Sequence, residues 1–171
     1  PHCLSLERHR MIWLWITKHS DLTTSKPRLL HIAPELSLMR HFKRLYKGSE
    51  NYITADLESP LAKIHFDVQQ IPLADNSIDV VICNHLLEHV DDDRKAMREL
   101  HRVLHPAGWG IMLVPEERQR ATTFEDDTIT DPKLRTELFG QYDHRRIYGR
   151  DYDERLRESG FRVERIAVES I

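Results

Sequence analysis

The chain has 171 residues, of which 40% are hydrophobic and 31% are charged, and its formal net charge is −3. These values describe one globular domain with room for a core, and they give no general attraction to nucleic acid or to a membrane surface. The longest early apolar run, Met11 to Ile16, is too short for a membrane span or a signal-peptide core. The two cysteines, Cys3 and Cys83, do not form a disulfide framework, so we expect a reducing, cytoplasmic setting.

The first predicted element is a helix over Leu6 to His19. It carries several bulky apolar residues in succession around Trp13, too many for all of them to face one core, so part of this helix is expected to cover a second surface. A polar loop over residues 21–26 follows. We therefore predict an N-terminal helical segment at 1–27 and a main domain at 28–171.

Three short apolar runs predict strands at Leu29–Ala33, Tyr52–Ala55 and Ile64–Phe66. A helix is predicted between the first two, with Pro34 in its first position and Gly48 at its end. The second and third strands end at Asp56 and Asp67. Only Leu57 to Lys63 separate them, which is short for a parallel crossover, so any helix there is expected to be vestigial.

The segment Ile78 to Cys83 is a β-branched apolar run interrupted only by Asp79. Such a run is typical of a strand buried on both faces of a parallel sheet, and it makes Cys83 a small buried hydrophobe. It ends in Asn84 and His85, polar residues at the position where α/β proteins bind ligands. The following acidic triplet, Asp91 to Asp93, favours a helix N-terminus.

The remaining predicted elements are a helix at Asp93–Leu104, a strand at Gly110–Val114, a helix at Asp151–Ser159 and a strand at Phe161–Val168. Residues 115–141 are charged and irregular, and their length favours a lid or a substrate loop. The order of elements predicts an α/β fold with a Rossmann-like, doubly wound, mostly parallel sheet.

Two segments, Asp67-Val-Gln-Gln-Ile-Pro-Leu through Leu-Leu-Glu-His-Val90 and Ala96-Met-Arg-Glu-Leu-His-Arg-Val-Leu-His-Pro-Ala-Gly108, resemble class I S-adenosylmethionine (SAM)-dependent methyltransferases of the type 11 kind. In that family an acidic residue ends the third strand, a Ser-Phe-Asp start opens the fourth, and a Leu-Glu-His-Val segment follows. The resemblance covers about residues 28 to 168. It implies the class I methyltransferase fold, SAM as cofactor and SAM-dependent methyl transfer. The loop His31-Ile-Ala-Pro-Glu35 is similar to that of an uncharacterised bacterial subgroup.

The first loop departs from the family pattern, which is an acidic residue followed by x-Gly-x-Gly. Residues 31–35 contain no glycine. A dinucleotide pyrophosphate needs close approach of the backbone and a helix N-terminus without negative charge, and Glu35 would repel it. SAM carries a cationic ammonium and a sulfonium, so it tolerates an acidic residue there. Charge therefore favours SAM over a dinucleotide.

The resemblance implies a cofactor-binding set of His31, Ile32, Ala33, Pro34, Glu35, Asp56, Leu57, Asp67, Val68, Asn84 and His85. Asp56 would accept hydrogen bonds from the ribose hydroxyls, with a strand-end turn as its structural alternative. Asp67 and the Val68 backbone would meet the adenine edge.

The methionine end of the cofactor would lie against residues 31–35, although His31 has the alternative of a core histidine. Asn84 and His85 would form the floor near the sulfonium, with polar capping as the alternative.

Methyl transfer is an in-line displacement at a sulfonium, so such an enzyme aligns donor and acceptor and, where needed, removes a proton. His89 and His144 are the candidate bases, with structural hydrogen bonding as their alternative.

His85 to His89 also fits the H-x-x-E-H pattern of inverted zinc peptidases, which requires a helix and a distal acidic ligand. The Glu-His pair with a later histidine is similar to a metal set in small-RNA 2′-O-methyltransferases. It is also common in class I members without metal, so we expect no metal.

The main hypothesis is an enzyme that acts on a small-molecule acceptor and does not bind a membrane. Two other hypotheses stay open. One is a degenerate methyltransferase fold that serves as a binding module. The other is a nucleic-acid-modifying methyltransferase, with phosphate contacts from Arg8, Arg10, Arg145, Arg146 and Arg150. The sequence indicates neither the acceptor atom nor the oligomeric state.

Both ends of the chain resemble interrupted elements. Pro1-His2-Cys3 is similar to the end of a Cys-Pro-x-Cys knuckle that precedes the domain in the same subgroup. Cys3 is therefore expected to be the remnant of a zinc site, since one cysteine cannot hold structural zinc alone. After Val168 we expect the usual antiparallel seventh strand to be missing.

Overall fold

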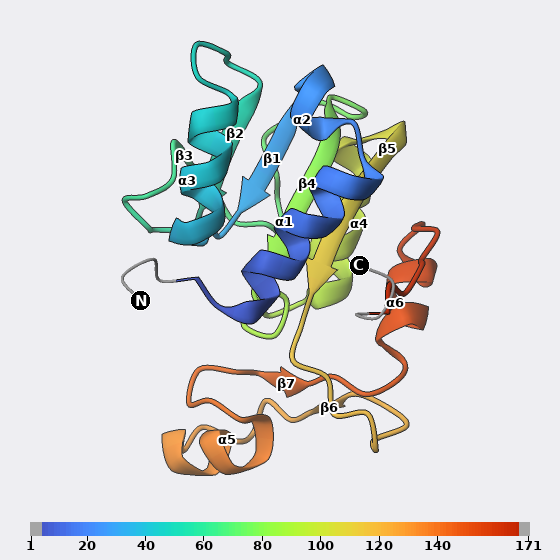
Figure 1. The fold of residues 1–171 in the computed structure, drawn as a ribbon. Coiled ribbons are helices and arrows are strands. Elements are labelled where there is room, and N and C mark those ends of the chain that lie inside the picture. Colours follow the sequence, from blue (N-terminus) through green and yellow to red (C-terminus); the bar gives the residue numbers. More distant parts are fainter. Residues whose placement is uncertain (1–4, 168–171) are drawn as a thin grey trace.

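The computed structural model describes residues 5–167 (Figure 1). The helices are α1 (Glu7–His19), α2 (Leu22–Ser25), α3 (Leu36–Leu45), α4 (Asp93–Val103), α5 (Pro132–Phe139) and α6 (Tyr152–Glu158). The strands are β1 (Leu29–Ile32), β2 (Tyr52–Asp56), β3 (Ile64–His65), β4 (Ile78–Asn84), β5 (Leu104–Leu113), β6 (Phe124–Glu125) and β7 (Arg146–Ile147). The proposed zinc remnant at Cys3 lies outside the described residues.

Five strands form one parallel sheet in the order β3-β2-β1-β4-β5. The chain runs outward from β1 to β3 and then returns to β4 on the other side of β1, where Ile32 pairs with both Ala55 and Cys83. The direction of winding therefore reverses between β1 and β4. This arrangement confirms the predicted Rossmann-like, class I methyltransferase fold.

Helices cover both faces of the sheet, as Figure 1 shows with α1 and α3 in front and α4 behind. Apolar residues of α1, α2 and α3 pack on one face together with Leu29 and Ile82. Those of α4 and α6 pack on the other face with Leu30 and Cys83, which is buried as predicted. Burial on both sides explains why β4 is apolar nearly throughout.

Helix α4 begins as its acidic start predicts, because the Asp92 side chain accepts a hydrogen bond from the Lys95 amide at 2.8 Å. Residues 21–26, predicted as a loop, contain the short helix α2, and two predicted boundaries were also wrong. Helix α3 begins after Glu35, so Pro34 precedes it. Strand β5 begins at Leu104 instead of Gly110, because the chain passes directly from α4 into an irregular pairing with β4.

The predicted irregular loop at 115–141 is partly ordered, which corrects the sequence-based interpretation. It contains β6 and α5, and β6 pairs with β7 in an antiparallel ladder. Asp131 caps α5 by accepting hydrogen bonds from two backbone amides, and Gly140 ends this helix with φ of 90°. The β6–α5–β7 unit lies at the carboxyl ends of the sheet strands (Figure 1).

The last predicted strand was also wrong within the described residues, because 161–167 form no ladder. Phe161 and Val163 pack on the α4 face of the core, and Arg165 pairs with Glu116 and Asp153. Side chains therefore hold this segment, and its alternating pattern reflects packing without strand pairing.

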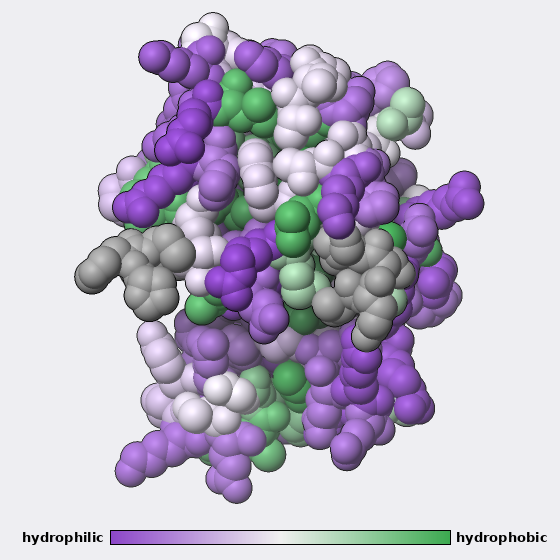
Figure 2. Space-filling view, viewed as in Figure 1, coloured by the Kyte–Doolittle hydropathy of each residue, from purple (hydrophilic) through white to green (hydrophobic). Residues whose placement is uncertain are grey.

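The face seen in Figure 2 is mostly hydrophilic, with hydrophobic residues in small separate patches. Among residues 5–167, none of the helices has the length and apolar character needed to cross a bilayer.

Candidate functional site

Two residues with left-handed backbone mark the edge of the sheet where the winding reverses. Ala33, just after β1, has φ of 46°, and His85, just after β4, has φ of 50°. Residues other than glycine are uncommon in this region, and such strain gathers at functional sites. The Ala33 amide donates to the Ala55 carbonyl at 2.8 Å, and the His85 amide donates to the Leu113 carbonyl at 2.7 Å. These hydrogen bonds fix both turns at the edge of the sheet where doubly wound folds bind ligands.

Ala33 explains how a first loop without glycine still makes its turn, and it gives a prediction about stability. The left-handed conformation costs an L-residue roughly 1–2 kcal/mol, whereas glycine loses about 0.5–1 kcal/mol of additional chain entropy on folding. Ala33→Gly should therefore raise the free energy of unfolding by about 0.5–1 kcal/mol. Urea unfolding should show this as a higher midpoint at an unchanged slope. Ala96→Gly, in buried helix α4, should instead destabilise the protein. A loss of stability in Ala33→Gly would contradict the strain argument.

Glu35 is the centre of a polar cluster between α1 and the strand ends. Its Oε1 accepts hydrogen bonds from the Arg8 guanidinium at 2.9 and 3.1 Å and from His9 Nε2 at 2.6 Å. His9 Nδ1 accepts from the Ser37 hydroxyl at 2.6 Å, so Nε2 is the nitrogen that carries the proton. The other oxygen, Oε2, accepts from Asn84 Nδ2 at 3.2 Å. Helix α1 therefore fixes one carboxylate oxygen and leaves the other beside β4.

The electrostatics of this cluster favour an ionised carboxylate. Burial alone would raise the pKa of Glu35, but hydrogen bonds from His9, Arg8 and Asn84 outweigh burial and lower this pKa. Within residues 5–167, the buried Oδ1 of Asn84 has no hydrogen-bond donor. Buried acceptors are nearly always paired in native proteins, so this oxygen marks a place for a donor from a ligand. The sequence analysis did not find Arg8 and His9 as neighbours of the loop.

The two predicted aspartates sit at strand ends, but they serve local turns. Asp56 Oδ1 accepts from the amides of Glu58 and Ser59 at 3.0 and 2.9 Å. Asp67 is exposed and accepts from the Gln69 amide at 2.8 Å. Asp56 therefore has the strand-end turn role that was its structural alternative. Its other carboxylate oxygen, Oδ2, makes no hydrogen bond with the described residues, so it can accept one from a ligand.

The hydrophobic neighbours of these aspartates differ in exposure. Leu57 is 62% exposed at the end of β2, whereas Val68 is buried in the α4-side core. Leu57 is thus an apolar side chain that a ligand over the end of β2 can cover.

His31 lies apart from the polar cluster, in the core between β1 and α3. Its Nδ1 lies 2.9 Å from the Tyr52 hydroxyl, and its ring packs edge-on against Phe42. Burial lowers the pKa of His31 to about 4, so the ring is neutral at neutral pH. Ile32 and Pro34 are also buried. Of the predicted loop residues, only Glu35 brings its side chain to the Asn84 amide.

The two candidate bases lie together on the far side of the β4 end. The His89 and His144 rings meet edge-to-face with centroids 4.8 Å apart. His144 is buried, and its Nδ1 donates to the Phe139 carbonyl at 2.8 Å. His89 is half-buried, with Nδ1 3.4 Å from Asp143. Glu88, which the sequence analysis did not assign to the site, is buried beside them.

Arg146 of β7 holds the loop that carries these groups. Its guanidinium donates to the carbonyls of Leu87, Val90 and Asp91 at 2.7–2.9 Å, and to Glu125 at 2.9 Å. Because Arg146 is 2% exposed, these bonds form away from water. The β6–α5–β7 unit is thus the support of loop 85–92.

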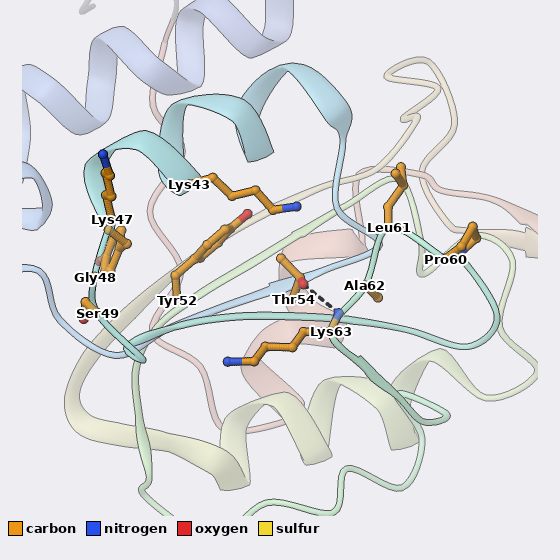
Figure 3. A pocket seen from close by; sticks show the side chains of 11 residues that line it. Lys43, Lys47, Gly48, Ser49, Tyr52, Thr54, Pro60, Leu61, Ala62 and Lys63 are labelled. Atoms are coloured by element: carbon orange, nitrogen blue, oxygen red, sulfur yellow. Dashed lines mark hydrogen bonds between the residues drawn. The ribbon is translucent and has the colours of Figure 1, made fainter.

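A separate cavity of about 470 Å³ lies against β2 (Figure 3). It opens where the crossover at residues 57–63 contains no helix, as its shortness predicts. Lys43, Lys47 and Lys63 line it, and in Figure 3 their side chains extend in three different directions. Lys63 is paired with Glu50 at 2.6 Å. The lysines therefore do not converge on one anion, and the carboxyl ends of the sheet strands remain the candidate functional site.

Comparison with known proteins identifies the family of the chain. The sequence model of the methyltransferase domain family matches residues 27–112, which is half of the chain and includes strands β1–β4. The chain therefore belongs to this family, the class I methyltransferases, whose cofactor is SAM.

The individual relatives are more distant or match a shorter part. A demethylmenaquinone methyltransferase of Staphylococcus epidermidis is 40% identical over 60 residues, which are 35% of this chain and 24% of that protein. The match thus spans about a quarter of this relative.

Two solved structures show the same fold. One is a putative sarcosine dimethylglycine methyltransferase from Galdieria sulphuraria, with 19% identity, a TM-score of 0.59, and coverage of 90% of this chain and 61% of that one. The other belongs to the complex between the Haloferax volcanii Trm112 methyltransferase activator and a putative methyltransferase, with 15% identity, a TM-score of 0.56, and coverage of 90% and 72%.

Proposed function

We propose that this chain transfers a methyl group from SAM to a small-molecule acceptor. When bound, SAM supplies an electrophilic methyl group on a sulfonium. The observation that carries the proposal is the pairing of Glu35 with Asn84 at the reversal of winding, where one buried amide oxygen has no donor among residues 5–167. The ammonium of an amino acid end offers the donors that both groups accept.

Charge supports the same assignment. Arg8 and Glu35 lie side by side, 2.9 Å apart, and present opposite charges. The methionine end of SAM is a zwitterion, so its carboxylate suits Arg8 and its ammonium suits Glu35 and Asn84. We assign Asp56, at the end of the next strand, to the ribose, and Asp67 and Val68, further along the same edge, to the adenine.

We assign His89 and His144 to the acceptor and not to the cofactor. His89 lies in the loop that follows β4, and His144, just before β7, packs against it. The acceptor lone pair displaces the neutral thioether in line, and any proton that the acceptor carries must leave through a group on this side. An imidazole pair with one partly exposed ring suits that task.

A small molecule fits the surface charges better than a nucleic acid. Of the five arginines considered for phosphate contact, Arg8 binds Glu35, Arg145 pairs with Asp91 and Asp127, and Arg146 is buried against main-chain carbonyls. The charges of these three arginines are compensated within the protein, which leaves Arg10 and Arg150 of the five for a phosphate backbone.

Calorimetric titration with SAM and S-adenosylhomocysteine tests the proposal. We expect one site per chain, and we expect Asp56→Ala to weaken both ligands by about tenfold or more, because the ribose loses a charged acceptor. Glu50→Gln, at an exposed carboxylate paired with Lys63, is the matched control and should bind like the wild type. A folded wild-type chain that binds neither ligand would support the degenerate binding module instead.

A further inference from the structure

Three side chains beyond the end of β4 converge within reach of one ion. Glu88, His89 and His144 each offer a ligand atom, and these atoms lie within 4.8 Å of one another. Glu88 is 1% exposed, and neither of its carboxylate oxygens has a hydrogen-bond partner in the described part of the chain. The Nδ1 of His85 lies 3.3 Å from Oε1 without hydrogen-bond geometry. A buried carboxylate with no donor is costly, so the fold calls for a positive partner at this point.

The two imidazoles are oriented as metal ligands are. A carbonyl oxygen only accepts, so the bond to Phe139 places the proton of His144 on Nδ1 and leaves Nε2 with its lone pair. His89 has a carboxylate, Asp143, beside its own Nδ1. Carbonyl and carboxylate partners behind the ring are the outer contacts that fix and strengthen histidine ligands.

We propose that Glu88, His89 and His144 bind one divalent transition-metal ion, for which Zn²⁺ is the best match. Two imidazoles and one carboxylate, with a fourth position open, form a common zinc ligand set, and imidazole disfavours Mg²⁺. Bond lengths of about 2.0–2.2 Å require ligand atoms roughly 3.4 Å apart, so the widest separation in the cluster must contract by up to about 1.4 Å. The His89 side chain is 30% exposed and has room for this movement. This proposal departs from the sequence-based expectation of no metal.

The ion would lie close to the proposed acceptor side, because Glu88 lies in the loop that begins directly after Asn84, the last residue of β4. An acceptor oxygen or nitrogen is a suitable fourth ligand, and with the ion bound the two imidazoles hold the metal and do not serve as the base. This last point rests on the proposed methyl transfer, whereas the metal site itself does not. Its test therefore uses metal binding without SAM.

The test is calorimetric titration of the chelator-treated full chain with ZnCl₂ and, separately, with MgCl₂. We expect one Zn²⁺ per chain and no Mg²⁺ binding. Glu88→Gln and His144→Gln should each weaken Zn²⁺ binding by more than about tenfold, since even outer-shell partners are worth roughly that factor. His19→Gln, at an exposed histidine of α1, is the matched control and should bind like the wild type.

Thermal unfolding distinguishes a metal-ligand role of Glu88 from a purely structural role. Zn²⁺ should raise the melting temperature of the wild type but not of Glu88→Gln. Without metal, Glu88→Gln should be at least as stable as the wild type, because a neutral amide replaces a buried carboxylate that has no donor. Zinc binding that is absent from the folded wild type, or unchanged in Glu88→Gln, would overturn the proposal. A metal-free Glu88→Gln that is less stable, with unchanged zinc binding, would show a purely structural role.

Discussion

Replacing Arg146 with alanine is expected to lower the free energy of unfolding by about 3–5 kcal/mol, the usual cost of breaking a buried charged network. The guanidinium satisfies three main-chain carbonyls and the Glu125 carboxylate. Its removal takes this donor from the carbonyls of Val90 and Asp91, and it leaves Leu87 with the Tyr148 hydroxyl and Glu125 with Arg155. Asp93, 3.9 Å from Arg146, would then depend on Arg155 alone for its nearby positive charge. Urea unfolding followed by circular dichroism measures the loss.

The neighbouring arginine is the natural control. Arg145 is partly exposed and pairs with the exposed carboxylates of Asp91 and Asp127, so Arg145→Ala should cost less than about 1 kcal/mol. Similar losses in both variants would show that burial of Arg146 does not matter. A lysine at 146 should recover little, because one ammonium cannot reproduce a planar fork that reaches several carbonyls.

The second large effect is expected at Glu35. Glu35→Gln keeps the shape of the side chain but removes the charge that faces Asn84, so SAM should bind about tenfold to a hundredfold more weakly, as for loss of a charged hydrogen bond. Calorimetric titration measures the change. The variant should remain folded, because Arg8 and His9 still have an amide oxygen to which they can donate.

A truncated ligand makes this test specific. 5′-Methylthioadenosine contains the adenine, the ribose and the sulfur but lacks the amino acid end. Glu35→Gln should leave its affinity unchanged, whereas Asp56→Ala should weaken it together with SAM. If Glu35→Gln weakens both ligands equally, Glu35 acts through the fold of the loop and does not contact the methionine end.

The parallel sheet could be predicted from the sequence because each of its signals lies within a few consecutive residues. The β-branched run that forms β4 can be buried on both faces, and the acidic residues before α4 can cap it, whatever lies elsewhere in the chain. The capping signals of α5, Asp131-Pro132 and Gly140, were equally local. They were overlooked because the whole segment was interpreted as one loop.

The parts that could not be predicted depend on contacts between distant residues. Arg8 and His9 meet Glu35 across 26 or 27 positions, and no periodic pattern on a helix marks such a partner. The strained turn at Ala33 shows no glycine in the sequence. Alternation after Gly160 resembled a strand because packing of Phe161 and Val163 has the same period as strand pairing.

The anchoring of loop 85–92 also constrains the time at which the site can form during synthesis. Arg146 binds carbonyls that precede it by 55 to 59 residues. Chains emerge from the ribosome N-terminus first, and contacts between distant residues form slowly. Strands β1, β2 and β4 can pair while the loop beyond β4 still lacks its donor. The sheet is therefore expected to assemble before the proposed acceptor side of the site, which can take its final shape only after Arg146 has emerged.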